Sequence, residues 1–536
     1  MSSKPKLVKK QSESAEAFFR VVSKGKQIFK LVFPDSENAF DSSAWNVQHL
    51  RDRTVTNSNA NLYFTRLSTT DEALPKHYAE VVKSWLISEY KLGTRSAEHP
   101  LAAARILWEA ILARRNGDSN NFQWETLCDE DLNQAEILMR QRWGQNTTYK
   151  CTSHLLSLGR FAATNAFSRP LYYVPQTPRV EDSNRHTIAG REERKARLPS
   201  SNSLHGLAEI YRLASDPPDQ LLSAAIAITA AAGFRVGELL TLPYDCEIEE
   251  ERAGKPRYGL RYYKEKNKGG AKLFAIRWLT PIQSELARDA IARIRSITET
   301  FRKRARLLES NPDRVPLSED VASPRLTARD IARPLGFKCN EWVYSIPAEK
   351  LKRSRDNEGI FYSTSDVEAY LLNRRVRRLW TVDRRDASYQ MLSETLMIAP
   401  KNFFHATKGV IPLLIEPVTV QKISNFISKR AGAKSAFERF NITESDGNFC
   451  RMTSHQLRYW LNDVADKGGL PVDTLTRWMG RENPRDTEAY RFETADEKCK
   501  RIQEGIRSGE IRGHLSELYF SLPEEERDVF LVSQVE

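Results

Sequence analysis

Side chains that together can cut a phosphodiester stand close to one another near the C-terminal end of the chain. His455 and Arg458 are three residues apart, Arg481 follows a Trp-Met-Gly sequence, and Tyr490 comes nine residues after Arg481. Arginine forks match the non-bridging oxygens of a phosphate, whose negative charge otherwise repels a nucleophile. A tyrosine hydroxyl can act as that nucleophile and conserve the bond energy in a phosphotyrosine ester. These residue types indicate chemistry in which a DNA strand is cut and rejoined without ATP.

One helix must position two of these side chains. The sequence predicts that it begins at residue 453 or 454, with Thr or Ser as the cap, and runs to about residue 465. It carries an apolar stripe at helical spacing, formed by Leu457, Leu461 and Val464. We therefore expect His455 and Arg458 to lie on the opposite side, one turn apart and facing away from the core.

A second arginine segment lies far upstream, where Gly233-Phe234-Arg235-Val236-Gly237-Glu238-Leu239-Leu240 follows an alanine-rich stretch. With this segment added, the chain resembles the tyrosine recombinases, also called phage-type integrases. The resemblance implies that the alanine-rich helix ends at Gly233, that Arg235 opens the next helix as the first phosphate clamp, and that Glu238 orients this box.

The same resemblance assigns roles to the C-terminal residues. Arg458 would be the second phosphate clamp, His455 the proton acceptor near the tyrosine, and Tyr490 the nucleophile that forms a 3′-phosphotyrosine intermediate. The family usually has histidine or tryptophan where this chain has Arg481. An arginine there can donate to a phosphate, but it cannot transfer a proton as histidine does.

A β-hairpin is expected between the two arginine segments. Residues 258–266 and 271–279 read as strands that flank an Asn-Lys-Gly-Gly turn. The family places a lysine general acid on this hairpin, where it protonates the leaving 5′ oxygen. We favour Lys266, with Lys268 second and Lys264 third.

The expected fold is mostly α with small β elements (α+β). Residues 1–75 would form an N-terminal arm or small β-containing domain, since 18–33 alternates as strands do. Apolar residues at helical spacing predict a bundle of helices at 76–180, which the resemblance implies is the core-binding domain that clamps DNA, followed by a linker at 181–197 rich in Arg, Glu, Ser and Pro. A recombinase-like catalytic domain would span 198–500, and a helical tail at 501–536 could contact another protomer.

The catalytic domain is expected to hold a long insertion. Arg235 and Arg458 are 223 residues apart, more than compact members of the family need, and the excess lies at about 302–448. Residues 362–372, followed by an arginine-rich run, could form a DNA-reading helix or the charged face of an inserted helical module, and we favour the second. The whole pattern looks most like the large integrases of bacterial transposon-like elements.

Charge and composition suit an anionic partner. The net charge is +12 and the sequence pI is near 9.2, which favours double-stranded DNA. We expect a homo-oligomer, a tetramer on two DNA sites, with accessory recombinase or directionality proteins as further partners. Nothing in the sequence calls for a cofactor, a metal or a membrane, and the expected location is the prokaryotic cytoplasm.

Two alternatives to a site-specific recombinase of mobile elements stay open. A non-catalytic DNA-binding subunit of a recombinase complex would keep the fold as a scaffold, and Arg481 is the residue that favours it. A type IB topoisomerase-like or telomere-resolving strand transferase would use nearly the same chemistry on one DNA partner. Dependence on a specific site and on two duplexes separates a recombinase from this second class.

Overall fold

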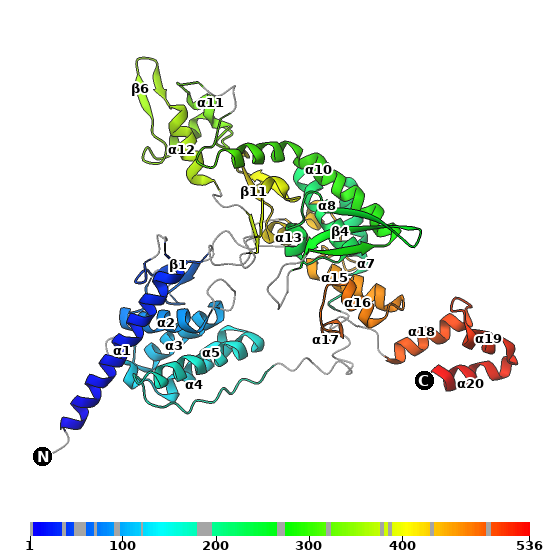
Figure 1. Cartoon of the computed structure of the whole chain (residues 1–536), viewed down its shortest axis with the longest axis horizontal. Coiled ribbons are helices and arrows are strands. Elements are labelled where there is room, and N and C mark those ends of the chain that lie inside the picture. Colours follow the sequence, from blue (N-terminus) through cyan, green and yellow to red (C-terminus); the bar gives the residue numbers. More distant parts are fainter. Residues whose placement is uncertain are drawn as a thin grey trace. The chain divides into compact units, whose positions relative to one another are not determined.

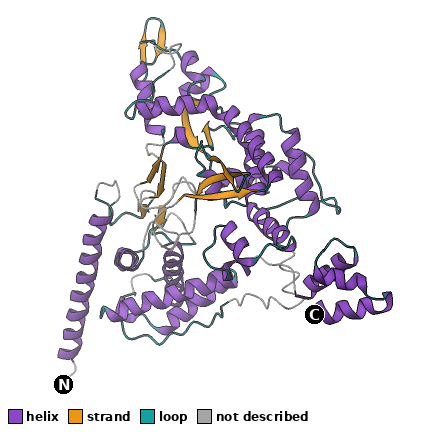
Figure 2. Cartoon of the chain, turned by 45° about the vertical axis from the view of Figure 1, so that its right-hand side comes forward, coloured by secondary structure: helices purple, strands orange, loops and turns teal. Residues whose placement is uncertain are grey.

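The computed structural model describes residues 4–34, 39–47, 61–68, 72–90, 97–118, 122–179, 196–264, 274–317, 323–375, 380–383, 388–428, 434–488 and 495–535. The chain forms two compact units, Met1–Asn184 and Arg185–Glu536. Helices predominate in both, and the strands make small antiparallel sheets (Figures 1 and 2). The predicted mostly α fold with small β elements is therefore confirmed. No helix in the described ranges is both long and apolar enough to cross a membrane.

The first unit is a helical body with one two-stranded sheet. Its elements are α1 (Lys4–Val32), β1 (Ala44–Asn46), β2 (Asn61–Tyr63), α2 (Lys76–Glu89), α3 (Glu98–Arg114), the 3-10 turn η3 (Trp124–Thr126), α4 (Asp129–Arg142) and α5 (Gln145–Thr164). One hydrophobic core extends from Val21 on α1 through Trp45, Trp85 and Trp108 to Tyr173. The expected boundary near residue 75 does not divide this core, because α1 and β1 pack into it with the later helices.

The prediction of strands at residues 18–33 was wrong, because 18–32 lie in α1 and Phe33 directly follows its end. The buried residues of this segment recur at helical intervals: Val21, Val22, Phe29 and Phe33. Aromatic packing gives the segment its partner, since Phe29 and Phe33 both contact Trp45. Packing against β1 and α2 thus selects the helix over the alternation.

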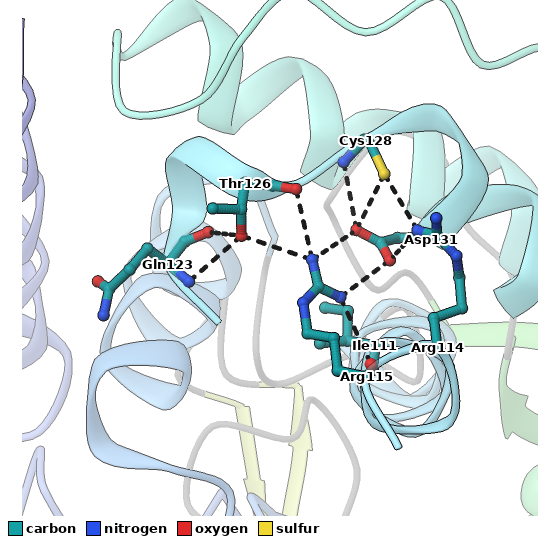
Figure 3. Close-up of polar contacts among 7 residues, drawn as sticks. All are labelled: Ile111, Arg114, Arg115, Gln123, Thr126, Cys128 and Asp131. Carbon is teal, nitrogen blue, oxygen red and sulfur yellow. Dashed lines mark hydrogen bonds and ion pairs between the residues drawn. The ribbon is translucent and has the colours of Figure 1, made fainter. Parts of the chain in front are cut away.

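A buried carboxylate joins α3 to α4 (Figure 3). Asp131, whose side chain is fully buried, accepts hydrogen bonds from Arg114 and from both Nη atoms of Arg115, at 3.0 and 3.2 Å. It also accepts from the backbone N of Cys128 at 3.2 Å, at the start of α4. Burial alone would raise the pKa of Asp131, but the two guanidinium groups reverse the effect and lower it.

A second carboxylate fastens the chain that leaves this unit. Glu136 on α4 accepts from the Tyr173 hydroxyl at 2.6 Å, from the backbone N of Gln176, and from the Thr177 hydroxyl. Arg140 completes the cluster at 2.7 Å. The extended segment 173–177 is thereby held on α4, and most of the expected linker, 181–197, lies outside the described residues.

The second unit is larger. Its first part contains α7 (Ser201–Leu213), α8 (Pro217–Ala232), α9 (Val236–Leu240), β3 (Glu247–Arg252), β4 (Lys255–Tyr263), β5 (Phe274–Leu279) and α10 (Pro281–Ser310). Helix α8 is buried along most of its length and packs against α7, α10, α13 and α15, so it is the central helix of this part. The predicted hairpin is confirmed as β4 and β5, and β3 adds a third strand that the sequence analysis did not anticipate.

Helix α10 leads from this part into an inserted body with its own core (Figure 1). The inserted elements are α11 (Ala328–Ala332), the 3-10 turn η5 (Asn340–Ser345), β6 (Ser354–Asp356), β7 (Gly359–Phe361), α12 (Thr364–Arg374), β8 (Trp380–Asp383), β9 (Ser388–Gln390), the 3-10 turn η6 (Leu392–Glu394), β10 (Ile398–Lys401) and β11 (Ile411–Pro417). The core of this body runs from Ala305 to Ile415, so it is shorter than the expected 302–448.

The chain returns to the first part of the unit before residue 448. Helix α13 (Val420–Ile427) packs against α8 and α9, and α14 (Ala436–Arg439) packs against α7. An ion pair strengthens this return, because Arg439 donates to Asp219 at the start of α8 at 2.6 Å. The segment from about residue 420 therefore belongs to the body that holds the candidate site.

The arginines at the end of α12 have mainly structural contacts. Arg374 donates to the hydroxyl of Tyr370, and Arg375 donates to the carbonyls of Leu308 and Asn311 at 2.6 and 2.8 Å, which caps the end of α10. Neither the DNA-reading helix nor the charged face of an inserted module is tested by these two contacts, so both stay predictions. The other two arginines of the run lie among residues 376–379, outside the described ranges.

The last elements are α15 (Ser454–Lys467), α16 (Val472–Trp478), α17 (Arg485–Glu488), α18 (Ala495–Arg507), α19 (His514–Ser521) and α20 (Glu524–Val535). Helix α15 packs against α8 and α16. The three tail helices share a small core formed by Ile506, Tyr519 and Leu531.

Candidate active site

The first arginine segment is a tight junction between two helices. Gly233 ends α8 in the left-handed conformation, with φ +62°, and Arg235 immediately precedes α9. Glu238, one turn into α9, accepts from the backbone N of Arg235 at 2.9 Å and from its Nη1 at 2.8 Å. The junction predicted from the resemblance is present, and Glu238 contacts Arg235 as expected of a residue that orients the box.

Glu238 is buried among positive charges. Its side chain is 1% exposed, and burial by itself would raise the pKa of the carboxyl. The charges of Arg235, Arg458 and Arg277 outweigh burial and lower that pKa. The carboxylate therefore stays ionised and offsets part of the charge of the arginines around it.

Arg458 departs from its predicted position. The structure confirms the helix, as α15, but Arg458 on it is 0% exposed, whereas Val464 of the expected apolar stripe is 47% exposed. Arg458 does not face away from the core, because its guanidinium turns toward the end of α8. Nη1 donates to the carbonyl of Gly233, and Nη2 donates to the carbonyl of Met479 at 2.6 Å.

These two bonds join the separate arginine segments. The Gly233 carbonyl lies two residues before Arg235, and the Met479 carbonyl lies two residues before Arg481. The close approach also explains the glycine, since a Cβ at Gly233 would meet Leu461 at 3.0 Å and Met479 at 3.2 Å. Arg458 thus links the two arginine segments by hydrogen bonds, and it also adds a positive charge to the site.

The turn after α16 carries Arg481. Gly480 has φ +67°, and Arg481 is 7% exposed and donates from Nη1 to the hydroxyl of Thr487 at 3.1 Å. Thr487 in turn shares a hydrogen bond of 2.6 Å with Thr476 on α16. This chain of bonds fixes Arg481 between α16 and α17, and its partner Thr487 lies three residues before the predicted nucleophile.

The hairpin contributes an arginine that the sequence analysis missed. Arg277 on β5 is 1% exposed and donates from Nη2 to the Tyr262 hydroxyl on β4 at 3.2 Å. The alternation along β5 did not reveal it, because the face opposite Arg277 is also apolar and carries the exposed Phe274 and Ile276. The one available signal was a charge inside an otherwise apolar strand.

The hairpin is also anchored to the second arginine segment through its backbone. The indole N–H of Trp478 donates to the carbonyl of Trp278 at 2.9 Å. Strand β5 and the end of α16 are therefore held together next to Arg277.

The four arginines act on one another electrostatically. Burial lowers the pKa of Arg458, and the charges of Arg235, Arg277 and Arg481 lower it further, while Glu238 opposes them. Such a concentration of positive charge in a buried place is costly unless a negative group offsets it. The arrangement is suited to an anion with several oxygens, such as a phosphate.

The structure describes only some of the remaining predicted site residues. His455, on the first turn of α15, is exposed and its ring lies 4.8 Å from that of Tyr459. Lys264 directly follows β4 and is partly exposed. Lys266, Lys268 and Tyr490 lie outside the described residues, so their roles stay predictions.

Comparison with known proteins finds similarity among solved structures only. No protein-family model matches the chain, and no curated protein matches it. Among solved structures, it is similar to the XerH site-specific recombinase bound to its palindromic difH substrate in a post-cleavage complex, at 12% sequence identity and a TM-score of 0.34. The likeness covers 83% of this chain and 87% of that one.

Proposed function

We propose that this chain is a site-specific DNA recombinase that cuts and rejoins strands through a 3′-phosphotyrosine at Tyr490. One observation carries the proposal: Arg235 and Arg458 lie beside the buried carboxylate Glu238, and Arg481 adds its charge next to Arg458. Those are the arginines that the sequence motifs single out as phosphate ligands. A phosphodiester is the anion that such a group would polarise and stabilise during attack.

In the proposed reaction, the Tyr490 hydroxyl attacks the phosphorus and the bond to the 5′ oxygen breaks. His455 receives the tyrosine proton, and a hairpin lysine, Lys266 in our assignment, gives a proton to the leaving 5′ oxygen. A DNA 5′ hydroxyl later attacks the phosphotyrosine, which reforms the diester and returns the tyrosine. Chain length supports the assignment of Tyr490 to this site. Tyr490 follows Thr487 by three residues, and three residues of chain span at most about 11 Å.

The proposed partners follow from the same chemistry. Double-stranded DNA supplies the phosphate, and the first unit, whose helices α2 to α5 share one core, is proposed to be the core-binding domain. Recombination requires two duplexes, so we propose assembly of a tetramer on two sites. Integration or excision of a mobile element is the biological setting we infer.

The decisive experiment traps the covalent intermediate. Suicide duplexes from the ends of the DNA element that carries the gene are nicked near each candidate site and incubated with the full chain in EDTA. Wild type is expected to form a 3′-linked adduct that survives denaturing gels, whereas Tyr490→Phe is expected to bind DNA normally and form none. Tyr459→Phe, which alters a tyrosine beside His455, serves as the matched control and should still form the adduct.

Each negative outcome has a meaning. An adduct formed by Tyr490→Phe would remove Tyr490 from the site, and peptide mapping would identify the true nucleophile. Specific DNA binding without an adduct at any cognate site would favour the non-catalytic scaffold. Relaxation of supercoils without demand for a specific site would favour the topoisomerase class.

A further inference from the structure

Arg277 is almost completely buried, but its guanidinium has few hydrogen-bond partners to offset the loss of water. Its side chain is 1% exposed, and Nη2 donates to the Tyr262 hydroxyl at 3.2 Å. Its Nε and Nη1 have no hydrogen-bond partner among the residues that the structure describes. Arg277 therefore brings a cationic side chain into the protein without the usual acceptors for its five N–H donors.

Aromatic rings partly replace the missing hydrogen-bond acceptors around the guanidinium. The guanidinium carbon lies 5.2 Å from the ring centroid of Tyr262, 5.7 Å from that of Phe234 and 6.0 Å from that of Trp478. Phe234 directly precedes Arg235, and Trp478 directly precedes the Met479 carbonyl that accepts from Arg458. Arg277 therefore touches both arginine segments.

The turn at Gly480 rests on the same pair of hairpin residues. A Cβ at Gly480 would lie 2.5 Å from the Tyr262 hydroxyl and 3.6 Å from Nη2 of Arg277. The backbone between Met479 and Arg481 can approach this closely only because glycine stands there. Displacement of Tyr262 or Arg277 would move the turn, and with it one acceptor of Arg458.

The charge of Arg277 also acts electrostatically on other ionisable residues of the site. The ionisable groups on which its charge acts are Tyr262 on β4, Glu238 on α9 and Arg458 on α15. Burial raises the pKa of Tyr262 and the charge of Arg277 opposes that rise, whereas the same charge is among the causes that lower the pKa of Glu238 and of Arg458. Glu238 and Arg458 belong to the arginine cluster that is proposed to bind phosphate. Arg277 lies behind them, closed off from solvent.

We propose that Arg277 is a positioning residue of the phosphate site, which adds a fixed positive charge behind Arg458 and Glu238 and supports the Met479–Arg481 turn. This inference rests on the proposed function, since the charge matters only where a phosphate binds and reacts. The residue acts through its neighbours and does not itself contact the DNA.

Two substitutions separate charge from shape. Arg277→Met keeps much of the volume and removes the charge, so single-turnover formation of the covalent adduct on saturating suicide DNA should slow roughly tenfold or more. Arg277→Lys keeps a charge and should recover most of the rate at low pH. Arg288→Met is the matched control, because Arg288 also stacks on a tyrosine, Tyr258 at 4.0 Å, but lies at the exposed ion pair with Glu249; its rate should equal that of wild type.

The pH profile of Arg277→Lys is the most informative measurement. Burial among cations favours the neutral amine, so the pKa of a lysine at this position should fall below its ordinary value. The rate of this variant, divided by that of wild type, should therefore decline as pH rises, whereas the ratio for Arg277→Met should stay flat. A purely structural role would produce no such decline.

The outcomes separate this inference from the proposed function. If wild type forms no adduct, the proposed function fails, and protection of peptides in α9 and α15 from hydrogen exchange by inorganic phosphate still tests Arg277: wild type should gain more protection than Arg277→Met. If wild type reacts and Arg277→Met reacts equally fast, the inference is wrong. Equal slowing of the Met and Lys variants at every pH would also overturn it, and if the Met variant does not fold, the Lys profile alone decides.

Discussion

Glu238→Gln tests whether one carboxylate offsets the buried arginines. The substitution preserves shape but removes the charge of a side chain that is 1% exposed and accepts two bonds from Arg235. An amide can still accept from the Arg235 backbone N, but its NH2 group would then face the Arg235 guanidinium, donor against donor. Removal of one member of a buried ion pair costs about 3 to 5 kcal/mol, because the other charge is left uncompensated.

Hydrogen-exchange mass spectrometry suits this prediction because it reports on each segment of a two-unit protein. Since 1.4 kcal/mol is a factor of ten in an equilibrium, this cost predicts that peptides from α9 and α15 exchange about a hundredfold to a few thousandfold faster in the variant. Peptides from α2 to α5 in the first unit should not change. Glu249→Gln is the control, because Glu249 and Arg288 form an exposed pair whose loss should cost less than about 1 kcal/mol.

Added phosphate should slow exchange in α9 and α15 of Glu238→Gln more than in the first unit, because an anion can replace the missing charge. Exchange in α9 and α15 that matches wild type within a factor of about two would refute the reasoning, since the arginines would then need no buried counter-charge. A loss of protection that phosphate cannot reduce would show that the carboxylate acts through its hydrogen bonds and not through its charge.

Two other substitutions test the contacts around the site and in the first unit. Gly480→Ala should slow adduct formation at least tenfold, because its φ of +67° strains an alanine and the new Cβ would lie 2.5 Å from the Tyr262 hydroxyl, whereas Gly509→Ala, with φ +75° and nothing within 4 Å, should not. Equal rates for both variants would remove the contact with Tyr262 from the account. Asp131→Asn should destabilise the first unit by about 3 kcal/mol near neutral pH. Because the folded-state pKa of Asp131 lies below its ordinary 3.8, the stabilisation by this carboxylate is complete above that pH and fades as pH falls through the lowered value, so urea unfolding should show wild type and variant converging in acid.

The sequence predicted those parts of the site that local chemistry determines. The resemblance of the first arginine segment to the recombinase family implied a helix that ends at Gly233 and a second helix opened by Arg235, and α8, Gly233 and α9 form as it implied. The helix that carries Arg458 and the hairpin of β4 and β5 also follow from local periodicity and turn residues.

Hydrophobic periodicity could not predict the orientation of several side chains, because that orientation depends on tertiary contacts. Arg458 and Leu457 are neighbours on α15, and both are buried, because the carbonyls of Gly233 and Met479 approach that side of the helix. The prediction of strands at residues 18–33 failed for a related reason, since packing against an aromatic partner, Trp45, favours the helix. Arg277 needed the same knowledge of its neighbours, Phe234 and Trp478, which are remote from it in sequence.

The buried arginines have a consequence for folding as well as for chemistry. Each is held by carbonyls, hydroxyls or rings: Arg458 by Gly233 and Met479, Arg481 by Thr487, Arg277 by Tyr262. These neutral partners fix geometry but cancel little charge, so Glu238 opposes several cations at once. A phosphate that enters the site would relieve this repulsion only in the folded protein, and a ligand that binds only the folded state stabilises it by mass action, by about 2.7 kcal/mol at a hundred times its Kd. Under the proposed function, the stability that the arginines of the second unit cost in the free protein would be regained when the phosphodiester of the DNA binds.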